Sequence, residues 1–224
     1  MTAIKQEADF QHFASYDVGM EQITALPFPL LPSRPDSWIL NAVSGSLSAK
    51  ALAKTDLYCN PKDGFSTDAP ATLNALTLLG NPGGKDFQLS AKVSVEFDSD
   101  YDAGALLIWV DPKTWAKFCF EYSPDKEAMV VSVVTRGASD DVNSFTIPIN
   151  EVWLRISRVG EVYAFHASTD GSLWRLIRVF TLGGGIENHQ VGFVAQAPVG
   201  DGCDVTFADI RFTYSSLTQL RDGS

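Results

Sequence analysis

The stretch from Trp115 to Tyr122 combines charged, aromatic and thiol side chains in a strictly alternating pattern. In an extended strand, such alternation sends neighbouring side chains to opposite faces. The apolar face carries Ala116, Phe118, Phe120 and Tyr122, and the other face carries Trp115, Lys117, Cys119 and Glu121. A lysine and a carboxylate therefore share one face. That face is either solvated sheet surface or the floor of a binding or catalytic groove.

Lys117 and Glu121 cannot neutralise each other directly, because four residues of extended strand separate them by roughly 13 Å. Burial of an unpaired charge is costly, so each must be solvated, paired with another residue or turned toward a cleft. A plain sheet surface would supply cross-strand ion pairs to Arg136 or Arg155. A groove would leave the two charges for a ligand.

Further polar and aromatic residues interrupt apolar runs, and indole rings beside Arg, Glu and Gln suit a sugar ring or an aromatic metabolite. The candidate ligand-binding residues are Trp109, Trp115, Asp140, Arg155 and Gln196. If the protein is an enzyme, the candidate catalytic residues are Glu121, Lys117 and Arg136. Desolvation would raise the pKa of Glu121 and suit it to general acid or base work. Lys117 and Arg136 would stabilise negative charge on a carbonyl or enolate oxygen.

Other catalytic constellations have little support. Glu96 and Asp98 stand two residues apart, as in some sandwich-fold glycosidases, but the run reads better as a solvated strand end. The three histidines, His12, His166 and His189, form no ligand-spaced pair, so we expect no metal site. The chain has no Gly-x-Ser-x-Gly elbow and no phosphate-binding glycine loop before a helix, and we expect no cofactor.

Composition places the chain among ordinary globular proteins, with 45% hydrophobic and 20% charged residues. A length of 224 residues suits one domain with one large core, spanning residues 1–224. The formal charge of −10 and the scattered Lys and Arg argue against nucleic acid or a membrane surface as a partner. No secretory signal is visible and the cysteine count is odd, which favours a cytoplasmic protein.

Period-two alternation dominates the chain and helical periodicity is scarce. We predict strands at 39–43, 46–51, 87–97, 103–110, 115–122, 129–136, 144–147, 152–158, 162–168, 174–180, 190–195 and 205–214. Tight turns make the strands 103–110, 115–122 and 129–136 antiparallel neighbours. About a dozen short strands indicate an all-β sandwich or barrel.

The same alternation predicts the core and the irregular segments. A change of parity in the last strand predicts a β-bulge near Ala208 and Asp209. The proline-rich segment 26–38 should run over the surface, and 57–81 should be a lid or a set of short edge strands. The predicted core residues are Phe118, Phe120, Leu154, Ile156, Phe193, Val205, Phe207 and Phe212.

Six stretches, in this order, resemble the regulation-of-enolase-type family, formerly a domain of unknown function. They are 101–106, 115–117 with Glu121, 131–140, 153–156, Asp170-Gly171 with Trp174, and 191–198. The resemblance covers about 38–214 and implies a concanavalin A-like jelly roll of two antiparallel sheets. Lectins, glucanases and a module of some β-xylosidases share that fold, so it implies no particular activity. Asp141 departs from the family, whose members often have an aromatic residue there.

Three hypotheses for the function follow. The first is a non-catalytic module that binds a carbohydrate or another small polar ligand in a Trp-lined concave groove. The second is a cofactor-independent isomerase, cyclase or lyase that acts on a small organic metabolite with Glu121 as general acid or base. The third is a regulatory protein-interaction module that binds a metabolic enzyme through its acidic surface.

Overall fold

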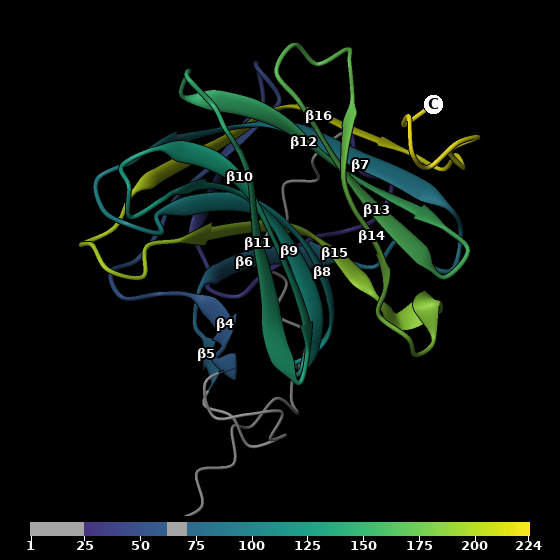
Figure 1. The fold of residues 1–224 in the computed structure, drawn as a ribbon, viewed down its shortest axis with the longest axis horizontal. Coiled ribbons are helices and arrows are strands. Elements are labelled where there is room, and N and C mark those ends of the chain that lie inside the picture. Colours follow the sequence, from purple (N-terminus) through teal and green to yellow (C-terminus); the bar gives the residue numbers. More distant parts are fainter. Residues whose placement is uncertain (1–24, 62–70) are drawn as a thin grey trace, which may run out of the picture.

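The computed structural model describes residues 25–61 and 71–224. Within these ranges two antiparallel seven-stranded sheets face each other, and a small two-stranded sheet lies beside them (Figure 1). The helical structure among the described residues includes a short 3-10 turn, η2 (Ile186–Asn188). No helix in these ranges is long and apolar enough to cross a bilayer. The predicted two-sheet antiparallel jelly roll is confirmed.

The two large sheets draw their strands from distant parts of the chain. Sheet A has the order β1 (Leu31–Pro32), β6 (Leu76–Gly80), β15 (Gln190–Gln196), β8 (Ala103–Asp111), β9 (Thr114–Tyr122), β10 (Ala128–Arg136) and β11 (Ala138–Thr146). Sheet B has the order β14 (Arg175–Thr181), β13 (Val162–Ser168), β12 (Glu151–Val159), β7 (Phe87–Glu96), β16 (Asp204–Thr213), β3 (Ser46–Lys50) and β2 (Trp38–Asn41). The small sheet pairs β4 (Leu57–Cys59) with β5 (Ala71–Leu73).

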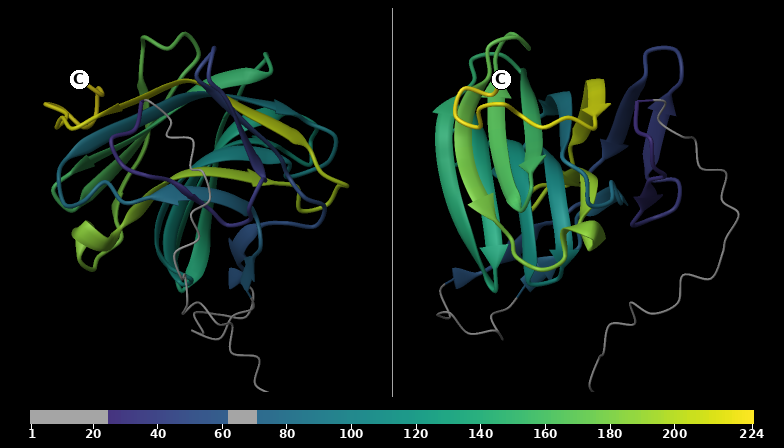
Figure 2. Two further views of the ribbon diagram at one scale, coloured as in Figure 1. Left: turned by 180° about the vertical axis from the view of Figure 1, so that it is seen from behind. Right: turned by 90° about the vertical axis from the view of Figure 1, so that its right-hand side faces the viewer.

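Strands β8 to β11 form a continuous antiparallel meander in sheet A (Figures 1 and 2). The predicted turns Asp111–Thr114 and Ser123–Lys126 connect the first three of these strands. Gly137, with φ of +83°, connects β10 to β11 in a conformation that side-chain-bearing residues rarely adopt. The predicted pairing of β8, β9 and β10 is therefore confirmed.

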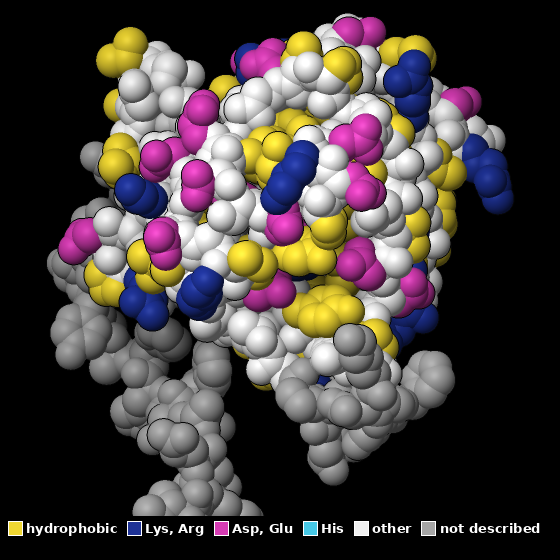
Figure 3. All heavy atoms as spheres, turned by 60° about the vertical axis from the view of Figure 1, so that its left-hand side comes forward, with side chains coloured by type: hydrophobic (Ala, Val, Ile, Leu, Met, Phe, Trp, Pro, Cys, Tyr) yellow, Lys and Arg dark blue, Asp and Glu magenta, His cyan; other side chains and the backbone are white. Residues whose placement is uncertain are grey.

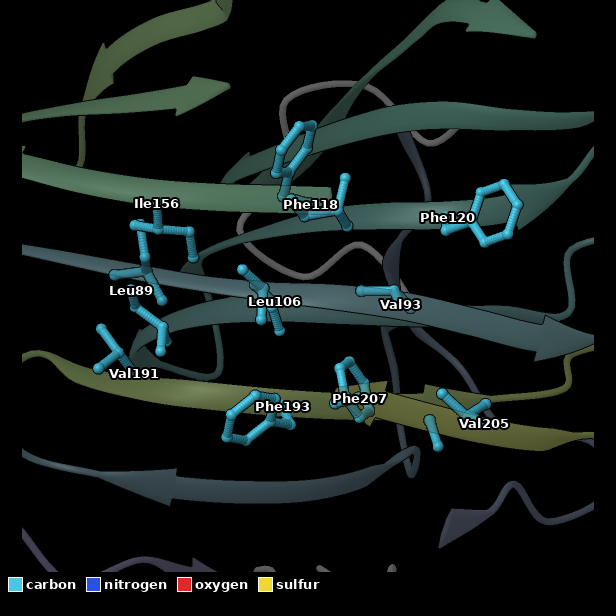
Figure 4. Packing of buried hydrophobic residues seen from close by; sticks show 14 of the residues in the cluster. Leu89, Val93, Leu106, Phe118, Phe120, Ile156, Val191, Phe193, Val205 and Phe207 are labelled. Carbon is cyan, nitrogen blue, oxygen red and sulfur yellow. The ribbon is translucent and has the colours of Figure 1, made fainter. Parts of the chain in front are cut away.

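The main hydrophobic core fills the space between sheets A and B (Figure 4). The predicted core residues Phe118, Phe120, Leu154, Ile156, Phe193, Val205 and Phe207 are all fully buried, and Phe212 is partly buried against them. A second hydrophobic cluster lies on the other face of sheet A and contains Trp115, Cys119 and Leu57. Strand β9 thus contributes to both clusters, one on each of its faces.

Two segments differ from the prediction. Strand β11 begins at Ala138, six residues before the predicted start, because its polar residues lie on an exposed edge strand that has no apolar alternation. The proline-rich segment 26–38 does not only run over the surface: Leu26 and Phe28 enter the core, and β1 pairs with β6 at the edge of sheet A. The predicted bulge is confirmed by a register shift between Ala208 and Arg211, where Asp209 has φ of +49°.

The core predicts the cost of truncating Phe120, which is fully buried and packs edge-on against Phe97 at 5.0 Å between ring centroids. Phe120→Ala should lower the free energy of unfolding by about 3–5 kcal/mol, because the lost burial is accompanied by a cavity. Denaturant unfolding measures the change. Val43→Ala is the control, since Val43 is fully exposed and its truncation should change stability by less than about 0.5 kcal/mol. Similar losses in both variants would contradict this account of the core.

Candidate functional site

The outer face of sheet A is partly covered by residues 53–60, here called the crossing segment. It starts at the end of β15, where Ala53 and Thr55 form bridges with Ala197. It ends over β11, where the backbone N–H of Cys59 donates to Ser139 Oγ at 2.9 Å. Between these points it passes over β9, which carries both Lys117 and Trp115. The face predicted to be either open surface or a groove is therefore covered at one end.

Lys117 is bound by the crossing segment. Its Nζ lies 3.1 Å from Asp56 Oδ1 and donates to Gln196 Oε1 at 2.9 Å, and the side chain is only 3% exposed. Burial alone would lower the pKa of Lys117, but the nearby acidic groups, Asp56 foremost, raise it above its ordinary value. The ammonium is therefore charged and already has its counter-ion. The alternative of a solvated face with cross-strand ion pairs to Arg136 or Arg155 does not describe Lys117, whose partner is Asp56.

Glu121 forms no ion pair with any residue that the structure describes. Its register neighbours on β8 and β10 are Ala103 and Met129, which offer no side-chain hydrogen bond. The residue is 9% exposed, and its carboxyl group has no hydrogen-bond partner in residues 25–61 and 71–224. Desolvation raises the pKa of Glu121 to about 8; Lys117 opposes the shift, and Asp141 and Asp56 add to it. At pH 7 this carboxyl group is mostly protonated, as the sequence argument expected.

Asp141 and Tyr58 complete the polar surroundings. Asp141 faces the same side as Lys117, because it pairs with Val133 and Val133 pairs with Lys117. Partial desolvation raises the pKa of Asp141, with Asp56 adding to the shift and Lys117 opposing it. Desolvation and the charges of Asp141 and Asp56 raise the pKa of Tyr58. The charge of Lys117 thus acts on three carboxyl groups, those of Asp56, Asp141 and Glu121. The group of Glu121 is the most deeply buried of the three and keeps its proton.

The structure brings five of the eight predicted site residues to one face: Trp109, Trp115, Lys117, Glu121 and Gln196. Trp115 is fully buried in the second hydrophobic cluster, and its indole N–H has no partner within the described chain. Trp109 is partly buried beside it. The sequence analysis placed these two indole rings in an open groove, and the structure instead buries Trp115 fully and Trp109 partly.

The other three predicted residues lie elsewhere. Arg136 is exposed and has the opposite parity on β10, and Asp140 has the opposite parity on β11, where its carboxylate pairs with Arg178 at 2.7 Å. Arg155 lies on β12 of sheet B, beneath the C-terminal residues. The sequence reasoning missed Asp56, Tyr58 and Asp141. Parity could have identified Asp141, whereas nothing local indicates the approach of Asp56 to β9.

Neither a metal cluster nor the cavity at the β9–β10 turn coincides with this site among the described residues. No three His, Cys, Asp or Glu side chains in these ranges are grouped to hold a metal ion. A cavity of about 430 Å³ lies at the β9–β10 turn, lined by 126–128 and 146–150, and Glu121 and Lys117 do not line it.

The fold and its relatives define the class of protein. The fold is the concanavalin A-like sandwich of two antiparallel sheets. The model of the family described as "Protein of unknown function (DUF1349)" matches residues 33–215, and the chain belongs to this family. The chain is 28% identical over 180 residues to "Regulation of enolase protein 1" of Saccharomyces cerevisiae, across 80% of this chain and 87% of the relative.

Two solved structures show the same fold. A functionally unknown protein from Saccharomyces cerevisiae superposes with a TM-score of 0.73 at 24% identity, over 87% of this chain and 98% of that one. The GH43 protein BlXynB of Bacillus licheniformis has a TM-score of 0.62 at 15% identity over 81% of this chain. The match covers 36% of the GH43 chain.

The buried ion pair predicts a large effect of Asp56→Asn. The substitution leaves Lys117 buried without a counter-charge and should lower the free energy of unfolding by about 3–5 kcal/mol. Asp140→Asn is the matched control, because Asp140 pairs with Arg178 while its side chain is 65% exposed. That change should cost about 0–1 kcal/mol in the same denaturant experiment. Equal losses would show that the Lys117 pair is not effectively buried.

The raised pKa of Glu121 predicts a pH dependence of stability. The folded protein holds a proton that the unfolded chain releases above about 4.5, so the free energy of unfolding falls as pH rises from 4.5 to about 8. The side chain of the Glu121→Gln variant cannot release a proton, so its free energy of unfolding lacks this fall. The difference in free energy of unfolding between the variant and wild type should therefore rise by up to about 4 kcal/mol over that range. Urea titrations at several pH values measure the difference. Parallel curves for the two proteins would refute the raised pKa.

Proposed function

We propose that the outer face of sheet A around Glu121 binds a small polar organic ligand, and that the neutral carboxyl of Glu121 donates a hydrogen bond to it. One observation carries the proposal: a nearly buried carboxyl group with pKa near 8 has no hydrogen-bond partner among the described residues. Glu121 remains 9% exposed, so a ligand can still reach it. A carbonyl or hydroxyl oxygen of a ligand would accept the hydrogen bond that the protonated carboxyl group can donate.

The surroundings of Glu121 favour a compact ligand. The crossing segment leaves Lys117 only 3% exposed and Trp115 fully buried, so contact is restricted to the Glu121 end of the face. Tyr101, which is 42% exposed, and the partly buried Met129 offer apolar contact area there. A saccharide would be one such ligand. It would stack on tyrosine rings, since the Trp115 ring is covered.

The pKa of Glu121 favours a second candidate, a cofactor-independent isomerase, cyclase or lyase. A group with a pKa near 8 exchanges its proton readily at physiological pH, which is the property of a general acid or base. Lys117 on the same strand would add positive potential toward an oxygen that gains negative charge. Arg136 has no part in this version, because it points away from the face.

The name of the yeast relative favours a third candidate, regulation of a metabolic enzyme by direct contact. The net charge of −10 gives such contact an electrostatic basis, and acidic side chains are spread over the face drawn in Figure 3. Purified enolase tests this idea: a saturable complex in ultracentrifugation, weakened by salt, would support it. No complex at micromolar concentrations would reject it for that enzyme.

The main proposal is tested by a thermal-shift screen of small carbonyl and hydroxyl compounds together with mono- to tetrasaccharides. A compound that stabilises the wild type should lose affinity in Glu121→Gln, which cannot donate from a carboxyl O–H. Asp141→Asn should also alter binding. Asp140→Asn should leave it unchanged, because Asp140 has the opposite parity.

The two leading candidates differ in what Glu121→Gln removes. Turnover reduced by a factor on the order of 10² with affinity retained indicates catalysis, since acid-base groups contribute at least that much. Weakened binding of a compound that the wild type does not convert indicates a binding module. Binding that is unchanged in Glu121→Gln and Asp141→Asn would reject the site for both.

A further inference from the structure

The residues after β16 lie across the outer face of sheet B, the sheet that does not contain Glu121 (Figures 1 and 2). Residues 215–224, here called the C-terminal segment, contact three successive strands. Gln88 of β7 donates to Ser215 Oγ at 3.0 Å, Arg155 of β12 donates to Gly223 O at 2.8 Å, and His166 of β13 bonds Leu220 O at 2.8 Å. Leu217 of this segment is buried.

Arg155 is buried beneath this segment without an anionic partner. The residue is 7% exposed, and its guanidinium lies 4.3 Å from the ring centroid of Trp174. Its Nη2 donates to a neutral carbonyl, its Nε has no acceptor, and no carboxylate in the described chain lies within ion-pair distance. Burial lowers the pKa of Arg155 to about 10. Proteins rarely leave a buried guanidinium so poorly compensated.

Two neighbours on the same face are also unsatisfied. His166 is the cross-strand partner of Arg155 and is fully buried, and its Nδ1 has no hydrogen-bond partner within the described chain. Burial lowers the pKa of His166 to about 4, so the ring is neutral. Ser157, two residues along β12 from Arg155, has a buried hydroxyl without a partner. Because Nε2–H of His166 donates to Leu220 O, its Nδ1 is an acceptor and needs a donor. Buried polar groups are normally satisfied, and the unused Nε–H donor of Arg155 is the one that an anion can satisfy.

We infer that Arg155 and Trp174 form a carboxylate-binding site beside the ring of His166, which the C-terminal segment closes by placing the carbonyl of Gly223 where one carboxylate oxygen would bind. The guanidinium edge matches a carboxylate through two parallel N–H bonds. The carbonyl uses only Nη2 and leaves Nε without an acceptor. A carboxylate would satisfy both donors and supply the missing negative charge.

The closure depends on a glycine. Gly223 has φ of +78°, and a Cβ at this position would lie 2.4 Å from Arg155 Nη2 and 3.2 Å from His166 Cδ2. Gly223→Ala in the full chain should therefore move the end of the segment off Arg155. Gly137→Ala is the matched control, because Gly137 has φ of +83° and no atom would lie within 4 Å of its Cβ. The control carries the same backbone strain without the displacement.

Acetate is the probe, titrated at constant ionic strength in chloride and followed by the NMR signals of His166 and the indole of Trp174. Gly223→Ala should bind acetate at least about tenfold more tightly than wild type. The reason is that the segment no longer closes the site, so a larger fraction of the protein molecules is able to bind acetate. Gly137→Ala should match the wild type. Arg155→Gln in the Gly223→Ala background should abolish binding, and Arg155→Lys should weaken it about tenfold through loss of the fork.

Three results would overturn the inference. They are no saturable acetate response in Gly223→Ala, a response that persists in both Arg155 variants, and equal affinity for chloride or phosphate. Thermal unfolding confirms that each variant is folded. If Arg155→Gln does not fold, the comparison of Arg155→Lys with Gly223→Ala decides.

Discussion

The ammonium of Lys117 is buried on a central strand and must be neutralised there, and the other features of this face follow from that constraint. Asp56, which lies 61 residues earlier in the chain, supplies the counter-charge. The pair therefore holds the crossing segment on sheet A, and with it the cover over Trp115. It also commits the lysine charge, so that Glu121 experiences desolvation and two neighbouring carboxyls without full compensation. The pairing of Lys117 with Asp56 thus explains why the carboxyl group of Glu121 stays protonated.

The same strand anchors the core and presents the chemistry. Phe118 and Phe120 fix β9 against sheet B, while Lys117 and Glu121 project from its other face. Strands β8 and β10 flank β9 along its length, so the acid is held on a rigid support and not on a loop. A site built in this way is preorganised, which favours either selective binding or proton transfer. The unsatisfied Arg155 under the C-terminal segment shows that sheet B has a polar face of its own.

Local alternation was enough to predict most of the strands, their core faces and the orientation of Lys117 and Glu121. It failed for β11, whose polar edge residues carry no apolar period. It also failed to show that Arg136, Asp140 and Arg155 lie away from Lys117 and Glu121. That required the parity at each position and the sheet to which each strand belongs. Asp56 could not be predicted at all. Its contact with Lys117 depends on how a distant segment crosses the finished sheet, which no local pattern records.

The central claim is that Glu121 is a neutral acid at pH 7 on the outer face of sheet A. The most direct measurement is the ¹³C chemical shift of its side-chain carboxyl, followed by NMR as pH is raised from 4 to 9, with Glu121→Gln identifying the signal. The account predicts a single titration with an apparent pKa near 8. A titration near 4.5, the ordinary value for glutamate, would contradict it, because the carboxylate would then be charged and solvated at neutral pH.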